Sequence, residues 1–350
     1  MKKLLYLLII LSISLFSCNN LKEKQDAQNK IENKIENKTN ADMNKYIPDE
    51  SKDIDRTNYA QKVYESVKHY DKEPVYYYRV HKQNCLIEIY INDVKDYRDF
   101  ELSNVITPEE IGHILKSGPQ KVKVKMYPVG DLINKDLGLE NTPPATILSE
   151  KASVAIDVVM MDNKSRKGFD DEKLIVRKVS SKEAAGKECH EFTFTFDAEV
   201  PYEFEGWTKG QDLRKLDPDL VHEKALEYYK MVGQLFLQKD LDSWLKVQYP
   251  FEQRIAGMFY WDKQYMNELV DEVKQEMDRE YQIQPFGKYT VEYMGDGKLL
   301  RLITDSKDSV FRGGGALFLN YGNGGVFRPG ITLYLPKGRD LKTQGFMMWK

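Results

Sequence analysis

The residues best suited to covalent chemistry are the three cysteines, Cys18, Cys85 and Cys189. A thiol can be acylated, oxidised to a disulfide or used as a metal ligand, depending on its compartment and its neighbours. Cys18 follows an apolar N-terminal run, whereas Cys85 and Cys189 lie in segments with the pattern of β-strands. The sequence therefore predicts one role for Cys18 and a different one for the other two.

The first seventeen residues have the layout of an export signal. Lys2 and Lys3 form a positive start, and residues 4–16 are an unbroken run of apolar and small polar side chains. A membrane-spanning helix needs about 20 apolar residues, whereas the apolar region of a signal peptide needs about 7–15. We therefore predict that residues 1–17 are a signal peptide that is removed.

The segment Leu15-Phe16-Ser17-Cys18 resembles the lipobox of bacterial lipoproteins, although Phe16 is bulkier than the residue usual there. In that family the cysteine is lipidated, with diacylglycerol and palmitate, and becomes the new N-terminus. The resemblance implies that Cys18 is the lipid attachment residue and that the protein is held on a membrane of the bacterial cell envelope, the outer membrane more than the inner one. The alternative is a general secretory signal with an incidental cysteine.

Residues 18–50 are polar and contain a near-repeat, Asn29-Lys30-Ile31-Glu32 followed by Asn33-Lys34-Ile35-Glu36. So few apolar side chains cannot offset the entropy lost on ordering. We predict a flexible tether, and the spacing of Ile31 and Ile35 leaves a short partner-binding helix as the alternative.

Hydrophobic periodicity divides the rest of the chain into three parts. Residues 51–73 are predicted to be an entry helix and linker, with a helix over 57–70 that Thr57 caps. Residues 74–206 alternate with period two and are predicted to form an antiparallel β-sandwich. The clearest strands cover 86–91, 121–126, 153–161, 173–179 and 191–196.

Residues 207–350 are predicted to form an α+β domain, with helices first and a curled antiparallel sheet after them. Asp217-Pro218 is a helix start, Tyr249-Pro250 is expected to break a helix, and another helix begins near Asp262. The predicted strands cover 289–294, 299–304, 316–321 and 326–335. The fold class is thus mixed, an all-β antiparallel sandwich followed by an α+β domain.

The segments Tyr228-Tyr229-x-x-Val232 and Asp240-Leu241-Asp242-Ser243-Trp244 resemble the helix pair of NTF2-like cone folds. The resemblance concerns the C-terminal half alone and implies a sheet that often encloses a small-molecule cavity. Members of that fold include enzymes as well as pure binding domains, so the resemblance selects no activity.

Cys85 and Cys189 are candidates for a disulfide, because an exported domain lies in an oxidising compartment. The alternative is two separate buried thiols. A zinc site would need His81 and His190 as well, but the neighbours Cys189 and His190 point to opposite faces of a strand. We therefore predict no metal site.

Sequence motifs for catalysis or cofactor binding are absent. The chain has no Gly-x-Ser-x-Gly, no His-Glu-x-x-His, no P-loop and no dinucleotide fingerprint, so we predict no catalytic residue and no cofactor. The run 312–315 (Arg-Gly-Gly-Gly) precedes a strand rather than a helix, which favours a flexible turn over a phosphate cradle. Lys121, Lys123 and Lys125 favour a solvated face or a guarded sheet edge over an anion-binding stripe.

Aromatic side chains gather at 76–78 and 259–261 and include four tryptophans, Trp207, Trp244, Trp261 and Trp349. Exposed aromatic side chains bind sugars or partner proteins, but aromatics also favour strands and cores. We favour the core for most of them.

The net charge of −3 falls to −5 once Lys2 and Lys3 are removed with the signal, which argues against a nucleic-acid partner. Our first hypothesis is a lipid-anchored envelope binding protein without catalytic activity, whose partner is a protein or a polysaccharide. One specific form is an immunity protein against an envelope-targeted toxin. The alternatives are a hydrolase or lipid- or glycan-modifying enzyme, with its site in a cavity of residues 207–350, and a purely structural envelope protein.

Overall fold

The computed structural model describes residues 43–350 except 103–107, 140, 166–170, 205, 307–310 and 323. The predicted signal peptide, Cys18 and most of the tether lie outside the described residues. Tyr46–Lys350 form one compact unit, and the domain boundary predicted near residue 206 falls inside it. No helix in the described ranges is long and apolar enough to cross a membrane.

The first eight strands form two four-stranded antiparallel sheets, which confirms the predicted all-β first half. Sheet A has the strand order β4-β1-β6-β7, and sheet B has the order β3-β2-β5-β8. The strand bounds are β1 Pro74–Gln83, β2 Leu86–Ile91, β3 Val94–Asp99, β4 Pro108–Glu110, β5 Gly118–Tyr127, β6 Ser153–Asp162, β7 Lys173–Val179 and β8 His190–Ala198.

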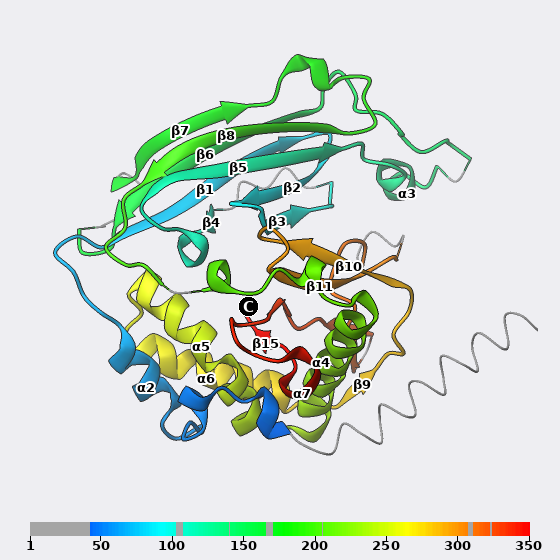
Figure 1. Ribbon diagram of the computed structural model, residues 1–350. Helices are drawn as coiled ribbons and strands as arrows, with labels where there is room; N and C mark the ends of the chain where they lie inside the picture. Colours follow the sequence, from blue (N-terminus) through cyan, green and yellow to red (C-terminus); the bar gives the residue numbers. More distant parts are fainter. Residues whose placement is uncertain are drawn as a thin grey trace, which may run out of the picture. The chain divides into compact units, whose positions relative to one another are not determined.

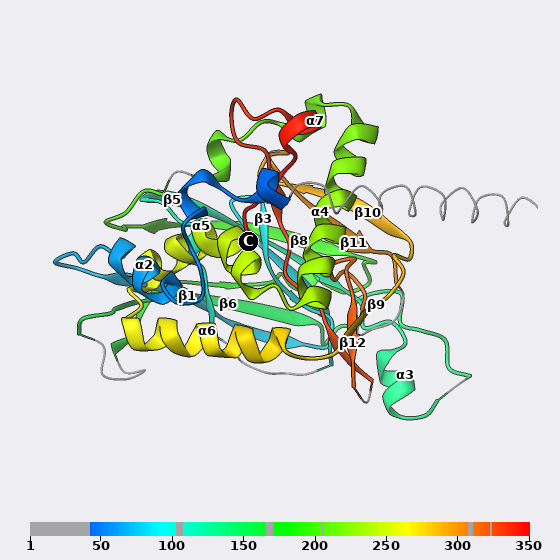
Figure 2. The same ribbon diagram turned by 90° about the horizontal axis from the view of Figure 1, so that it is seen from below.

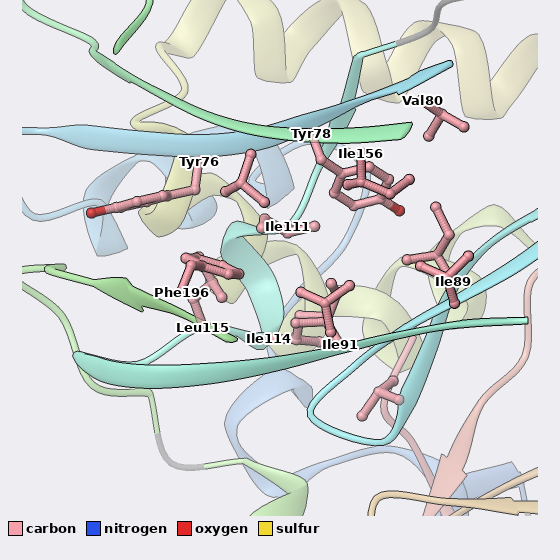
Figure 3. Packing of buried hydrophobic residues seen from close by; sticks show 14 of the residues in the cluster. Tyr76, Tyr78, Val80, Ile89, Ile91, Ile111, Ile114, Leu115, Ile156 and Phe196 are labelled. Atoms are coloured by element: carbon pink, nitrogen blue, oxygen red, sulfur yellow. The ribbon is translucent and has the colours of Figure 1, made fainter. Parts of the chain in front are cut away.

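The facing sides of sheets A and B form the hydrophobic core. Ile89 and Ile91 of β2 have no exposed surface and lie opposite Tyr78 and Ile156 of sheet A (Figure 3). Because side chains alternate along a strand, burying these isoleucines places Glu88 and Tyr90 on the other face of sheet B. That second face therefore carries the polar side chains of the sheet.

Cross-strand register gathers charges on the second face of sheet B. Glu88 lies between Arg98 of β3 and Lys125 of β5, and Tyr90 lies between Lys95 and Lys123. We call this the charged face.

The lysine row lies in an interior strand, because β5 is flanked by β2 and β8. The interpretation as a guarded sheet edge is therefore wrong. Alternation of polar and apolar residues shows that one face of a strand is exposed to solvent, but it does not show whether the strand lies at the edge or in the interior of its sheet. Lys123 and Lys125 contact acidic side chains, with Nζ 3.4 Å from Asp93 Oδ1 and 3.9 Å from Glu191 Oε2, respectively.

Helices make up most of the chain between the two groups of strands. The α-helices are α2 Tyr59–Ser66, α3 Leu132–Asp136, α4 Pro218–Gln238, α5 Leu241–Phe259, α6 Lys263–Met277 and α7 Leu341–Gln344. The 3-10 turns are η1 Met43–Tyr46, η2 Asp49–Ser51, η3 Gly112–Ile114, η5 Lys182–Ala184, η6 Trp207–Lys209 and η7 Leu213–Lys215. Helices α2, α5 and α6 pack on one another (Figure 2).

Helix starts follow the predicted caps where an aspartate precedes the helix. Asp217 accepts hydrogen bonds from the backbone N–H groups of Asp219 and Leu220, and Asp262 caps α6 in the same manner. The helix predicted over 57–70 is shorter and begins at Tyr59, and Asp55 rather than Thr57 accepts the backbone N–H groups before it.

Pro250 does not break a helix, contrary to the prediction, because α5 continues through it. Proline in a helix interior costs about 3 kcal/mol. Helix α5 offsets this cost by burying side chains on both sides of the proline, such as Trp244 before it and Met258 after it.

The last strands are antiparallel and follow the helices, as predicted, but they form two sheets rather than one, and the strand predicted over 326–335 is divided between them at residues 328–332. Sheet C has the order β10-β11-β14-β15, and sheet D has the order β13-β12-β9. Their strands are β9 Tyr281–Ile283, β10 Tyr289–Met294, β11 Leu299–Thr304, β12 Leu319–Tyr321, β13 Gly325–Phe327, β14 Leu333–Tyr334 and β15 Met347–Met348. The turn 295–297 joins β10 to β11 with positive φ at all three residues.

The two halves share one core. Met258, Leu299 and Trp349 belong to the same hydrophobic cluster as the inner residues of the sandwich. In Figure 1 the end of the chain accordingly lies between the strands of sheets A and B and helices α5 and α6. The fold is therefore the predicted sandwich followed by helices and antiparallel sheets, with the halves packed on each other.

Glu252 of α5 gives the fold a predicted pH dependence. Burial raises the pKa of Glu252 to about 7, and its Oε2 has no hydrogen-bond partner among the described residues. The unfolded chain binds fewer protons than the folded chain between pH 4.5 and 7, so ionisation of this group should lower the free energy of unfolding as pH rises, by roughly 3 kcal/mol in total. Denaturant titrations across this pH range should show that Glu252→Gln removes this contribution.

The matched control is Glu272→Gln, which changes an exposed carboxylate on α6. It should leave the pH dependence of the wild-type chain unchanged. Equal pH dependence in Glu252→Gln and the wild type would contradict the assignment.

Candidate anion-binding site

Arg98 and Arg312 lie against the ring of Phe100, which directly follows β3. The guanidinium carbon of Arg98 is 5.2 Å from the centre of this ring, and that of Arg312 is 4.9 Å from it. The ring in turn packs edge-on against Tyr127 of β5, with 5.8 Å between ring centres. Phe100 therefore holds two guanidinium groups from distant parts of the sequence near each other.

The glycine run after Arg312 allows this close approach. A Cβ atom on Gly313 would lie 3.2 Å from Cδ of Arg98, and one on Gly314 would lie 2.8 Å from Nη1 of Arg328. Gly313 also has a φ of +70°, which favours glycine. The predicted turn is present, and its backbone packs against two arginine side chains.

Arg301 adds a third cationic group from β11. Its Cα partner on β10 is Glu292, and the glycine run joins the same sheet through a bridge between Ile303 and Gly315. Sheet B, sheet C and the glycine turn thus each contribute one arginine. We call Arg98, Arg301 and Arg312 the arginine cluster.

The members of the arginine cluster have donors without acceptors. Nη1 of Arg98, Nε of Arg301 and Nε of Arg312 are buried and have no hydrogen-bond partner among the described residues. Within the same ranges, none of the three guanidinium groups forms an ion pair with a carboxylate. A buried donor without a partner costs about 1–3 kcal/mol, so a ligand that accepts hydrogen bonds from these groups would stabilise the protein.

Two acids beside the cluster, Glu88 and Glu292, are held by a lysine. Lys95 Nζ lies 2.7 Å from Glu88 Oε1 and 2.6 Å from Glu292 Oε1. Glu88 also accepts hydrogen bonds from the hydroxyls of Tyr90 and Tyr127 at 3.0 and 2.9 Å. Burial opposes ionisation of Glu88, but Lys95 and these hydroxyls bring its pKa below the usual value, so the carboxylate stays charged.

Electrostatics disfavours the arginine cluster when no anion is bound. Burial lowers the pKa of Arg98, and Arg328, Arg301 and Arg312 lower it further. A guanidinium nevertheless stays protonated in proteins. Two unit charges about 8 Å apart repel each other by about 2 kcal/mol at an effective dielectric constant of 20.

An anion would remove this repulsion and satisfy the buried donors at the same time. Guanidinium groups bind carboxylate, phosphate and sulfate groups through paired N–H donors. The arrangement is therefore suited to holding an anionic group. Sequence reasoning missed it because Arg98 lies more than 200 positions before Arg301 and Arg312 in the chain, and only the glycine run hinted at one of them.

The candidate disulfide is not formed, since Cys85 and Cys189 are both free thiols. They directly precede β2 and β8, and β5 lies between these strands. Neighbouring strands are about 4.8 Å apart, so two such steps exceed the limit of about 7 Å between the Cα atoms of a disulfide. Cys85 is instead buried, with its Sγ 3.6 Å from the carbonyl oxygen of Ser153.

The residues considered for zinc are also separated. His81 Nε2 lies 3.0 Å from Asp157 Oδ2, which also accepts from Arg177 at 2.8 Å. In the part of the chain that the structure describes, no group of three or more histidine, cysteine, aspartate or glutamate side chains could hold a metal ion.

A pocket of about 470 Å³ lies between the two halves of the chain rather than inside residues 207–350. Glu109 of β4, Lys350, and the aromatic side chains of Tyr77, Phe259 and Trp261 line it. Burial raises the pKa of Glu109, and Asp96 raises it further while Lys350 opposes them. Tyr77 and Phe259 are buried, as expected, but they also line this pocket, whereas Trp207, Trp244 and Trp349 are buried and do not line it.

Removing one charge from the arginine cluster should stabilise the protein without ligand. At low salt, Arg301→Gln should raise the free energy of unfolding by about 1–2 kcal/mol, because it relieves repulsion and a buried unpaired donor. High salt should reduce this difference. Denaturant titrations at two salt concentrations measure it.

The control is Lys95→Gln, which leaves Glu88 and Glu292 without their shared cation and should destabilise the protein by about 3–5 kcal/mol. A loss of stability in Arg301→Gln as large as that in Lys95→Gln would show that Arg301 has a partner within the fold.

Comparisons with protein-family models, with curated proteins and with solved structures give no match for this chain. The resemblances to bacterial lipoproteins and to NTF2-like folds thus stay predictions, and the function has to be inferred from the chemistry of the site.

Proposed function

We propose that this protein is a lipid-anchored binding protein of the bacterial envelope, without catalytic activity, that holds an anionic group of its partner at the arginine cluster. The observation that carries the proposal is the set of buried, unpaired donors on Arg98, Arg301 and Arg312. A protein surface with acidic side chains or an anionic polysaccharide offers the missing acceptors.

The anchor in this proposal is Cys18, whose segment resembles a lipobox. Two or more acyl chains hold a protein stably on a membrane. The polar residues after Cys18 would then let the folded part reach a partner away from the bilayer. An immunity protein that covers the active site of an envelope-targeted toxin is one specific form of this function.

A hydrolase or lipid- or glycan-modifying enzyme is the second candidate. The pocket of about 470 Å³ supports it, because a pocket of this size suits a small molecule. The raised pKa of Glu109 suits a general acid. The arginine cluster favours a binding function over catalysis, because its donors need an anionic acceptor but no reacting group.

The anchor can be tested in cells. Full-length protein expressed in a bacterial host should incorporate labelled palmitate and sediment with membranes, and Cys18→Ser should abolish both because the acylated thiol is gone. Cys85→Ser is the matched control and should remain labelled. Equal membrane association of Cys18→Ser would contradict the lipid anchor.

The binding site can be tested with a polyanion. The mature chain should bind dextran sulfate but not neutral dextran, as measured by biolayer interferometry. The double variant Arg98→Gln/Arg301→Gln should lose at least tenfold in affinity, because it removes two of the three unpaired guanidinium groups.

Lys121→Gln/Lys178→Gln removes the same charge at two exposed positions and should change the affinity less than twofold. Equal losses in both double variants would mean that net charge alone attracts the polymer. Turnover of a glycan or lipid substrate that depends on Glu109 would instead support the enzyme.

A further inference from the structure

The arginine cluster carries more positive charge than one carboxylate can balance. Guanidinium groups stay protonated in proteins, and two acids beside the cluster, Glu88 and Glu292, share a single lysine, Lys95. Three arginines and one lysine against two carboxylates give a net charge of +2, so a bound monoanion would leave one charge uncompensated, whereas a dianion would leave none. Charge balance therefore favours a dianion.

The three arginines come from different parts of the fold, which bears on the shape of the ligand that they can bind. Arg98 comes from β3, Arg301 from β11 and Arg312 from the glycine turn, so donors approach from three separate elements. A carboxylate has two oxygens in one plane. A phosphate monoester has three terminal oxygens around phosphorus, which can each accept from a different guanidinium.

Phe100 restricts the guanidinium groups on which this match depends. The ring lies 5.2 Å from the guanidinium carbon of Arg98 and 4.9 Å from that of Arg312, and it is packed against Tyr127. Side chains held in this manner lose little freedom when they bind, which favours a specific ligand over a diffuse ion cloud.

We infer that the arginine cluster binds a terminal phosphate monoester. This inference rests on the proposed function and narrows the anionic group held at the same site from any carboxylate, sulfate or phosphate to a phosphate monoester. The phosphate can belong to a small soluble molecule or to the headgroup of a lipid, and both present the same group with two negative charges at neutral pH. Phosphodiesters and sulfate esters have similar shapes but carry one charge.

The experiment compares a phosphate dianion with a phosphate monoanion and a sulfate monoanion. The mature chain is titrated at pH 7.5 with glycerol 3-phosphate, with its methyl diester and with methyl sulfate, by isothermal titration calorimetry. Glycerol 3-phosphate should bind at least tenfold more tightly than the other two. Arg98→Gln/Arg301→Gln should lose that affinity, and Lys121→Gln/Lys178→Gln should keep it.

Arg312→Lys provides a variant that retains the charge but loses the paired donors, and it should weaken glycerol 3-phosphate binding at least fivefold while its thermal unfolding stays cooperative. Vesicles of phosphatidylcholine with phosphatidic acid, compared with vesicles containing phosphatidylglycerol, distinguish the two sources of the group. Binding to the phosphatidic acid vesicles alone supports a lipid monoester, and binding to glycerol 3-phosphate alone supports a soluble one.

Two results would overturn the inference and can be told apart. Equal, arginine-dependent affinity for the monoester, the diester and methyl sulfate would disprove the monoester preference and leave the proposed anion site intact. Ligand binding that is the same in the wild type and in Arg98→Gln/Arg301→Gln would disprove both.

Discussion

The ion pairs of Lys95 with Glu88 and Glu292 are the interaction on which the arrangement of the two halves depends. Lys95 and Glu88 belong to sheet B, whereas Glu292 belongs to sheet C, so one ammonium group joins the halves. Its side chain is only 6% exposed. Removing one partner of such a buried pair leaves an uncompensated charge, which typically costs 3–5 kcal/mol.

Contacts beside Lys95 extend the same junction. The backbone N–H of Lys95 lies 3.4 Å from Sδ of Met294, and Asp93 accepts the backbone N–H groups of Gly295 and Asp296. The turn between β2 and β3 thus docks on the turn between β10 and β11. This docking covers part of the charged face of sheet B and brings Arg301 to the same side as Arg98.

The unpaired donors of the arginine cluster follow from the way in which Lys95 pairs with the glutamates. The charged face cannot be covered by apolar side chains without leaving buried charges unpaired. Lys95 pairs with Glu88 and with one carboxylate oxygen of Glu292, and the arginines keep buried donors without a hydrogen-bond partner among the described residues. Buried donors without partners lower the stability of the fold, and a bound anion would remove this cost. We therefore propose that the arginine cluster is the binding site.

Local sequence patterns predicted most of the helices and strands. The features that they did not predict depend on contacts between residues far apart in the chain. The alternation in β5 and the aspartate caps of α4 and α6 depend on neighbours within a few residues, so the sequence reveals them. The path of α5 through Pro250 depends on tertiary packing, and the separation of Cys85 from Cys189 depends on strand order. Neither can be read from spacing.

The candidate site shows the same contrast. The glycine run at 313–315 predicted a turn, and the turn is present. The convergence of Arg98, Arg301 and Arg312 requires the docking of sheet C on sheet B, which no local pattern encodes.

The most direct measurement is an anomalous difference map from crystals of the mature chain soaked in selenate, a tetrahedral dianion. Our account predicts a peak with its oxygens within about 3 Å of nitrogens from at least two of Arg98, Arg301 and Arg312. Guanidinium groups that are paired with carboxylates of the chain itself, and no selenate between them, would contradict it.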